Sequence, residues 1–150
     1  MKMNFFITII PTLLFATVFM GCEKTELGCT EKYAANYSVT ATDNDGSCYY
    51  NDITFIFWLN EERVDYYISS GATFPMDVAV NGEVIGTINE DDAFETKPGC
   101  SEEGVVKYTK EMSGKTGSIQ YEFIDEYGTT YYSVSRNIDA AAGECQGLLL

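Results

Sequence analysis

The chain has 150 residues, a formal net charge of −14 at pH 7 and no His. Without His there is no Ser-His-Asp triad, Cys-His couple or His-ligated zinc. The negative charge excludes nucleic acid as a partner, because phosphate binding needs a basic surface. The length fits one ordinary domain with small additions, and a hydrophobic fraction of 45% argues against global disorder.

Residues 1–21 predict a signal peptide. Lys2 gives the N-terminus a positive charge, and a mostly apolar run extends from Phe5 to Met20. A membrane-spanning helix is the alternative, but the run holds about 16 residues, whereas a span needs about 20. Pro11 also interrupts the run. We therefore expect export of the chain.

The end of this segment, Phe19-Met20-Gly21-Cys22, resembles the cleavage motif of bacterial lipoproteins. Phe19 departs from the family, which usually has Leu or a small aliphatic residue there. The resemblance implies cleavage before Cys22 and lipid attachment at Cys22. Two or three acyl chains give stable membrane attachment, so the expected location is the bacterial cell envelope, at the outer membrane or cell surface. An ordinary cleaved signal and a retained anchor are the alternatives.

Four further cysteines predict disulfides, since an even number in an exported chain is typical of them. Four cysteines can be connected in three ways, and we expect the most local one, which pairs Cys29 with Cys48 and Cys100 with Cys145. A zinc site is disfavoured because no two cysteines have the C-x2-C spacing. A catalytic thiol is disfavoured because no His can activate it. We expect no cofactor.

Residues 22–27 are predicted to be a polar tether, and residues 28–50 a small cysteine-bounded module. The module resembles a motif common in exported and surface proteins of Bacteroidetes. The matching residues are Gly28-Cys29, Ala34, Asn36-Tyr37, Ala41 and Asn44-Asp45-Gly46-Ser47-Cys48. The family's prolines are replaced by Glu31-Lys32 and Ser38-Val39. The resemblance implies an extracytoplasmic, disulfide-closed unit and no reaction. A segment this short needs such a staple.

Asp43 and Asp45 are weak calcium candidates, because the Asp43-Asn44-Asp45-Gly46 run is similar to the first half of a calcium loop. The acidic ligand that completes such a loop is missing downstream. A plain turn is the alternative, since Asn, Asp and Gly favour turns.

Residues 51–150 predict an all-β, immunoglobulin-like sandwich of about seven strands. Ile53–Leu59 is apolar on both faces and predicts a central buried strand. Asn81-Gly82 lies between apolar runs of Asp77–Ile88 and predicts a tight hairpin. Residues 118–123 alternate, with Ile119, Tyr121 and Phe123 expected to face inward. Residues 63–69 predict a returning strand or a polar loop, and no helix is predicted.

This region also resembles small Bacteroidetes lipoprotein β-domains. The resemblance is carried by a few matching positions, namely Phe57, Trp58, Val78, Val80, Gly82, Gly86, Cys100 and Cys145. It implies no chemistry that could be assigned to particular residues.

Two groups of residues are candidate sites. The first is an acidic loop, Glu90, Asp91, Asp92 and Glu95, which could bind a cation or form a hydrolase's carboxylate pair. The two carboxylates of such a hydrolase must face each other across a cleft. Neighbouring residues of one loop seldom do so, and a solvated loop without a site is therefore favoured. The second group is a set of tyrosines that could stack on a ligand. Tyr66, Tyr67, Tyr127 and Tyr131 are expected to be exposed, whereas Trp58 is expected in the core.

The sequence therefore predicts a non-enzymatic, lipid-anchored envelope protein with a structural or binding role. Its expected partners are the membrane, through the lipid, and a glycan or another envelope protein. A carboxylate-dependent hydrolase using Asp91 and Asp92 is the enzymatic alternative.

Overall fold

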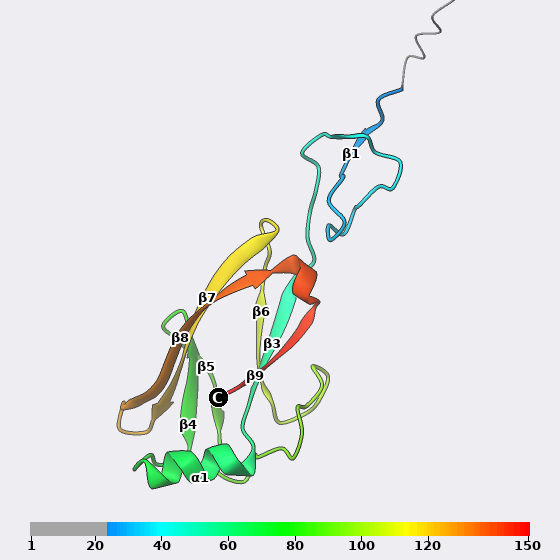
Figure 1. Ribbon diagram of the computed structural model, residues 1–150. Helices are drawn as coiled ribbons and strands as arrows, with labels where there is room; N and C mark the ends of the chain where they lie inside the picture. The colour runs from blue at the N-terminus through cyan, green and yellow to red at the C-terminus, as the bar shows by residue number, and fades with distance from the viewer. Residues whose placement is uncertain (1–23) are drawn as a thin grey trace, which may run out of the picture.

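The computed structural model describes residues 24–150, and this part of the chain is mostly strand (Figure 1). The strands are β1 (Leu27–Gly28), β2 (Asp43–Asn44), β3 (Ile53–Trp58), β4 (Met76–Val80), β5 (Glu83–Ile88), β6 (Val106–Lys110), β7 (Thr116–Asp125), β8 (Thr130–Asp139) and β9 (Cys145–Leu149). One α-helix, α1 (Glu61–Ser69), and one short 3-10 helix, η1 (Ala140–Ala142), complete the described elements. The predicted β-rich class is confirmed.

Residues 51–150, called the β domain, form two sheets. One has the strand order β6-β3-β9, and the other has the order β5-β4-β7-β8. The pairing of β3 with β9 is parallel, whereas the remaining pairs in both sheets are antiparallel. The first strand of the β domain is therefore held between two strands that come much later in the chain.

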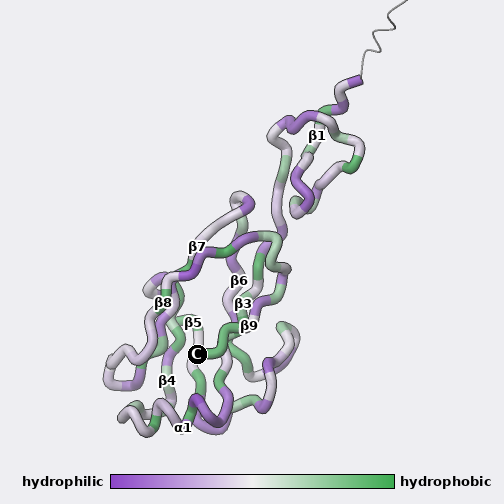
Figure 2. Tube along the Cα trace, in the orientation of Figure 1, coloured by the Kyte–Doolittle hydropathy of each residue, from purple (hydrophilic) through white to green (hydrophobic). Residues whose placement is uncertain are grey.

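The two sheets share one core. Across it, the ring centroids of Phe57 on β3 and Tyr121 on β7 lie 5.3 Å apart in an edge-to-face arrangement. Ile119, Tyr121 and Phe123 are all buried, which confirms their predicted inward direction. Hydrophobic residues follow the strands of the β domain, whereas residues 24–50 have few of them (Figure 2).

The three-stranded sheet is covered on both faces, as the apolar sequence of β3 predicts. Phe55 and Phe57 belong to the shared core, whereas Ile56 and Trp58, on the opposite face, are also buried. The β5–β6 loop, residues 89–105, crosses that opposite face. It is held by a hydrogen bond from the Phe94 amide to the Leu59 carbonyl oxygen and by the Cys100–Cys145 disulfide.

The predicted hairpin is confirmed. β4 and β5 are antiparallel neighbours joined by Asn81 and Gly82, whose φ angles are 52° and 84°. Two successive residues with positive φ are what a type I′ turn requires, and Asn followed by Gly accepts this at the smallest steric cost.

The prediction of a strand or loop at residues 63–69 is wrong, because this segment lies in α1. Asn60 caps the helix, with its Oδ1 accepting from the Arg63 amide at 3.0 Å, and Glu61 and Glu62 occupy the first turn. Both features favour a helix N-terminus. Val64 and Tyr67, one turn apart, are the buried residues that pack the helix on the core.

Candidate functional site

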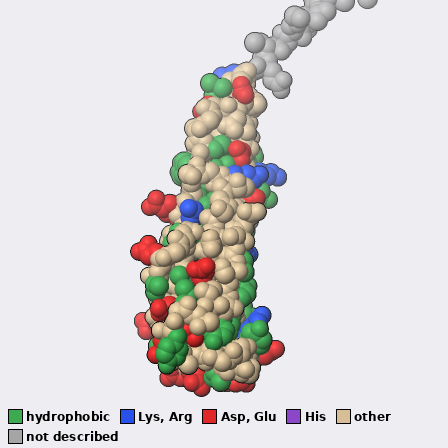
Figure 3. Space-filling model, turned by 90° about the vertical axis from the view of Figure 1, so that its left-hand side faces the viewer, with side chains coloured by type: hydrophobic (Ala, Val, Ile, Leu, Met, Phe, Trp, Pro, Cys, Tyr) green, Lys and Arg blue, Asp and Glu red, His purple; other side chains and the backbone are tan. Residues whose placement is uncertain are grey.

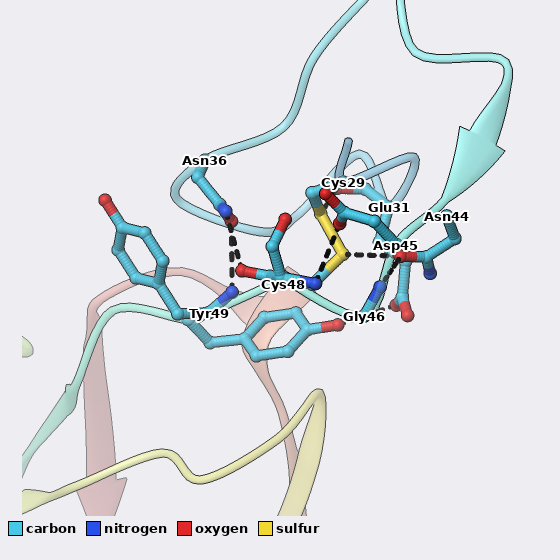
Figure 4. The surroundings of a disulfide bond; sticks show 10 residues. Cys29, Glu31, Asn36, Asn44, Asp45, Gly46, Cys48 and Tyr49 are labelled. Carbon is cyan, nitrogen blue, oxygen red and sulfur yellow. Dashed lines mark hydrogen bonds between the residues drawn. A yellow bond between two sulfur atoms is a disulfide. The ribbon is translucent and has the colours of Figure 1, made fainter. Parts of the chain in front are cut away.

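The cysteine module, residues 28–50, is closed by the disulfide between Cys29 and Cys48 (Figure 4). Their Cα atoms lie 4.9 Å apart, and Cys29 is only 1% exposed. The short strands β1 and β2 run parallel beside it, with Leu27 opposite Asp43. Glu26, expected in the tether, is hydrogen-bonded into this unit through its amide and Thr42 Oγ1.

Asn36 joins the two halves of the cysteine module, as Figure 4 shows. Its Nδ2 donates to the Ser47 carbonyl oxygen at 2.7 Å, and its Oδ1 accepts from the Tyr49 amide at 3.0 Å. The sequence marked Asn36 only as a motif position, because its two partners are more than ten residues away.

Tyr50 ties the end of the module to its beginning. Its hydroxyl donates to Glu31 Oε2 at 2.7 Å. This hydrogen bond to the carboxylate raises the pKa of Tyr50 above its ordinary value, since losing the phenolic proton would break the bond.

Of the two calcium candidates, Asp43 lies in β2 and Asp45 belongs to the hydrogen-bonded turn that follows. Asn44 Oδ1 accepts from the Gly46 amide at 3.0 Å, and Asp45 Oδ1 accepts from the Ser47 amide at 2.9 Å. Hydrogen bonds from Ser47 lower the pKa of the Asp45 carboxyl. Among residues 24–150, no three His, Cys, Asp or Glu side chains come together in a way that could hold a metal ion, so Asp43 and Asp45 have no such group around them.

The acidic loop lies against α1 at one end of the molecule, where Figure 3 shows acidic side chains gathered. Within it, Asp92 Oδ2 accepts from the amide and the Nδ2 of Asn89, at 2.8 and 2.7 Å. Asp91 and Glu95 are exposed. Asp92 therefore closes a turn with Asn89.

The predicted tyrosine set is half correct. Tyr66 and Tyr127 are exposed, at 56% and 76%, but Tyr67 is 1% exposed and its ring packs edge-to-face on Phe123 at 5.1 Å. Burial raises the pKa of Tyr67 to about 12. Tyr131 is half-buried, with its ring 6.2 Å from that of Tyr67. Trp58 is buried, as expected.

The exposed rings that the sequence analysis missed lie in the cysteine module. Tyr33 is 58% exposed, Tyr49 is 59% exposed and Tyr37 is 40% exposed. Their neighbours in the sequence are small or polar, so the module has too little apolar surface to bury them. Composition could have found them, because a segment of this length with a single cross-link leaves its large rings at the surface.

A cavity of about 240 Å³, called the junction cavity, lies where the module meets the β domain. Tyr33 comes from the module, whereas Asn51, Ile53 and Glu144 come from the start of β3 and from the turn before β9. Ala140 and Ala141 of η1, with Gly143 just after it, form the remaining wall. Asn51 Nδ2 donates to Glu144 Oε1 at 2.6 Å, so an amide and a carboxylate stand together at its edge.

The predicted signal peptide, residues 1–21, and the predicted lipid attachment residue, Cys22, lie outside the described residues. Within residues 24–150, no helix has the length and apolar character needed to cross a bilayer.

Comparison of the chain with protein-family models, with curated proteins and with solved structures finds no match in any of the three.

Proposed function

We propose that the protein is a non-enzymatic lipoprotein of the bacterial cell envelope, attached through Cys22 at the outer membrane or cell surface, with a structural or binding role. The sequence of residues 1–22 supports the anchor. The two disulfides support an oxidising, extracytoplasmic location, because such bonds persist there and are rare in reducing compartments.

The observation that carries the proposal is the order of the units along the chain. The described chain begins at the end of the cysteine module that lies away from the β domain (Figure 1). A lipid at Cys22 would thus be followed by the module and then by the β domain. The module acts as a cross-linked spacer that holds the β domain away from the membrane.

The same proposal places the β domain in the sandwich class. Two facing sheets around one core support this class. In an immunoglobulin domain the first strand shares a sheet with the second, fourth and fifth strands. Here β3 shares a sheet with β6 and β9 instead. We therefore propose a β-sandwich whose strand order differs from that of an immunoglobulin domain.

Metabolic labelling with a palmitate precursor tests the anchor. We expect label on the full chain and none on Cys22→Ala, and mass spectrometry should find Cys22 as the acylated first residue. Cys29→Ser is the matched control, because it removes a cysteine in the module and should keep its label. A labelled Cys22→Ala chain would refute lipid attachment at this residue.

A second candidate function is ligand binding by exposed tyrosines. The exposed rings of Tyr33, Tyr37 and Tyr49, all in one small module, favour it. Aromatic rings that keep a polar end in water are frequent in binding surfaces. A glycan array probed with the mature chain tests the carbohydrate version, and we expect binding that is lost when the three residues are changed to Ala. No bound glycan would exclude that version.

A further inference from the structure

We infer that the junction cavity binds one sugar ring of a neutral glycan, with Tyr33 as the stacking ring and the Asn51–Glu144 pair as the hydroxyl-binding group. The inference rests on the second candidate function and gives it a location and a ligand class. It is independent of the lipid anchor.

The size of the junction cavity sets the first limit on the ligand. Its volume is about 240 Å³, below the roughly 300–1,000 Å³ that is usual for drug-sized ligands. A single ring-sized unit fits such a space, whereas the rest of a longer chain would extend into solvent. An oligosaccharide that places one ring in the cavity satisfies this limit.

The lining of the cavity sets the second limit. Ile53, Ala140 and Ala141 supply apolar walls, and Tyr33 adds an aromatic ring with an exposed fraction of 58%. A pyranose ring has an apolar face of C–H groups and an edge of hydroxyl groups. It therefore needs both an apolar surface and polar groups beside it, which this cavity provides.

The Asn51–Glu144 pair sets the third limit. Because Asn51 Nδ2 donates one hydrogen to Glu144 Oε1, the pair keeps a second N–H donor, the amide oxygen and the other carboxylate oxygen free for a ligand. Donors and acceptors side by side match sugar hydroxyls, which both donate and accept. The carboxylate and the absence of any Lys or Arg among the lining residues disfavour an anionic ligand.

A protonated amine is the competing ligand, since one ring and one carboxylate could hold a cation. Two features favour the sugar. The free N–H of Asn51 can donate to a sugar hydroxyl but finds no acceptor on an ammonium group, which only donates. Cages for cationic ligands also surround the charge with aromatic rings, whereas Tyr33 is the one aromatic residue among those that line this cavity.

Isothermal calorimetry on the mature chain tests the inference with three probes: cellotriose, maltotriose and n-butylamine as the amine. We expect at least one trisaccharide to bind and Tyr33→Ala to weaken its affinity about tenfold. Tyr33→Phe should stay within about threefold of the parent because it keeps the ring. Glu144→Ala should weaken binding as Tyr33→Ala does.

Val39→Ala is the matched control, because Val39 is exposed in the same module, does not line the cavity and belongs to no proposed site. Tyr49→Ala separates the junction site from the other exposed tyrosines of the module, because Tyr49 has nearly the same exposure as Tyr33 and does not line the cavity. Non-reducing mass spectrometry checks that each variant keeps both disulfides. Sugar binding that is lost in Tyr49→Ala and kept in Tyr33→Ala would overturn the junction site and would still support ligand binding by other exposed tyrosines of the module. Binding of butylamine alone, or of none of the probes, would overturn the inference.

Discussion

The cysteine module and the β domain are stabilised in different ways. Between residues 24 and 50 the buried hydrophobic residues are Cys29 and Ala34, whereas the β domain buries a continuous cluster that reaches from β3 to the last residues of the chain. The module instead relies on a disulfide, on Asn36 and on side-chain-capped turns. A segment too short for a core can still have a defined shape, provided that a cross-link limits its unfolded states.

Phe123→Ala should have the largest effect, and only on the β domain. Phe123 is fully buried between Tyr67 and Phe74, and loss of such a ring costs about 4 kcal/mol. Urea unfolding followed by Trp58 fluorescence measures this change. Tyr127→Ala, at a 76% exposed ring, is the control and should change stability by less than about 0.5 kcal/mol. A loss below about 1 kcal/mol for Phe123→Ala would contradict the packing described above.

Removing the module's disulfide with Cys29→Ser and Cys48→Ser should destabilise that unit by about 3 kcal/mol and leave the β domain folded. Hydrogen exchange should show loss of protection within residues 26–50 and an unchanged Trp58 unfolding transition. The paired control, Cys100→Ser with Cys145→Ser, should lower the Trp58 transition instead. If both double variants lower it equally, the two units are not stabilised separately.

Alkaline pH should destabilise the β domain through its buried rings. Burial raises the pKa of both Tyr67 and Tyr121 to about 12, whereas an unfolded tyrosine titrates near 10. The native state therefore keeps protons that the unfolded state loses, so this stability is complete below pH 10 and is lost between pH 10 and 12.

The loss should be on the order of 2 kcal/mol for each ring. Urea unfolding at pH 8, 10 and 11.5 measures it, and Tyr67→Phe should show a shallower decline because it lacks the ionisable hydroxyl. An identical decline in Tyr67→Phe would show that other groups cause it.

Asn36→Ala should have the smallest effect, about 1 kcal/mol, confined to the module. It removes the hydrogen bonds to the Ser47 carbonyl oxygen and from the Tyr49 amide. Exchange of the Tyr49 amide hydrogen measures the effect directly. Asn36→Asp keeps the acceptor and should retain part of the protection. Unchanged exchange in Asn36→Ala would mean that the disulfide alone holds the module.

Local patterns predicted much of the fold. The alternation of residues 118–123 and the Asn81-Gly82 turn each depend on a few neighbouring residues, and both are confirmed. The helix α1 was missed because only Val64 and Tyr67 form its buried side. Two residues one turn apart do not establish a helical period, although Asn60 before Glu61 and Glu62 is a helix-start signal that could have been used.

The missed helix also explains the wrong assignment of Tyr67. Successive helical residues point about 100° apart, so Tyr66 faces solvent while Tyr67 faces the core.

The junction cavity could not be predicted from the sequence for a different reason. It joins Tyr33 to Glu144, which are brought together only when β9 pairs with β3.

The parallel pairing of β3 with β9 has a consequence for the order of folding. During synthesis β3 emerges first among the strands of the β domain, with Phe55, Ile56 and Phe57 unpaired on one side until residues 145–149 have been made. Contacts so distant in sequence form slowly because the intervening loop must close first. We expect the nascent β domain to stay open until almost the whole chain exists. A chain that stays open in this way needs shielding from aggregation until its sheet closes.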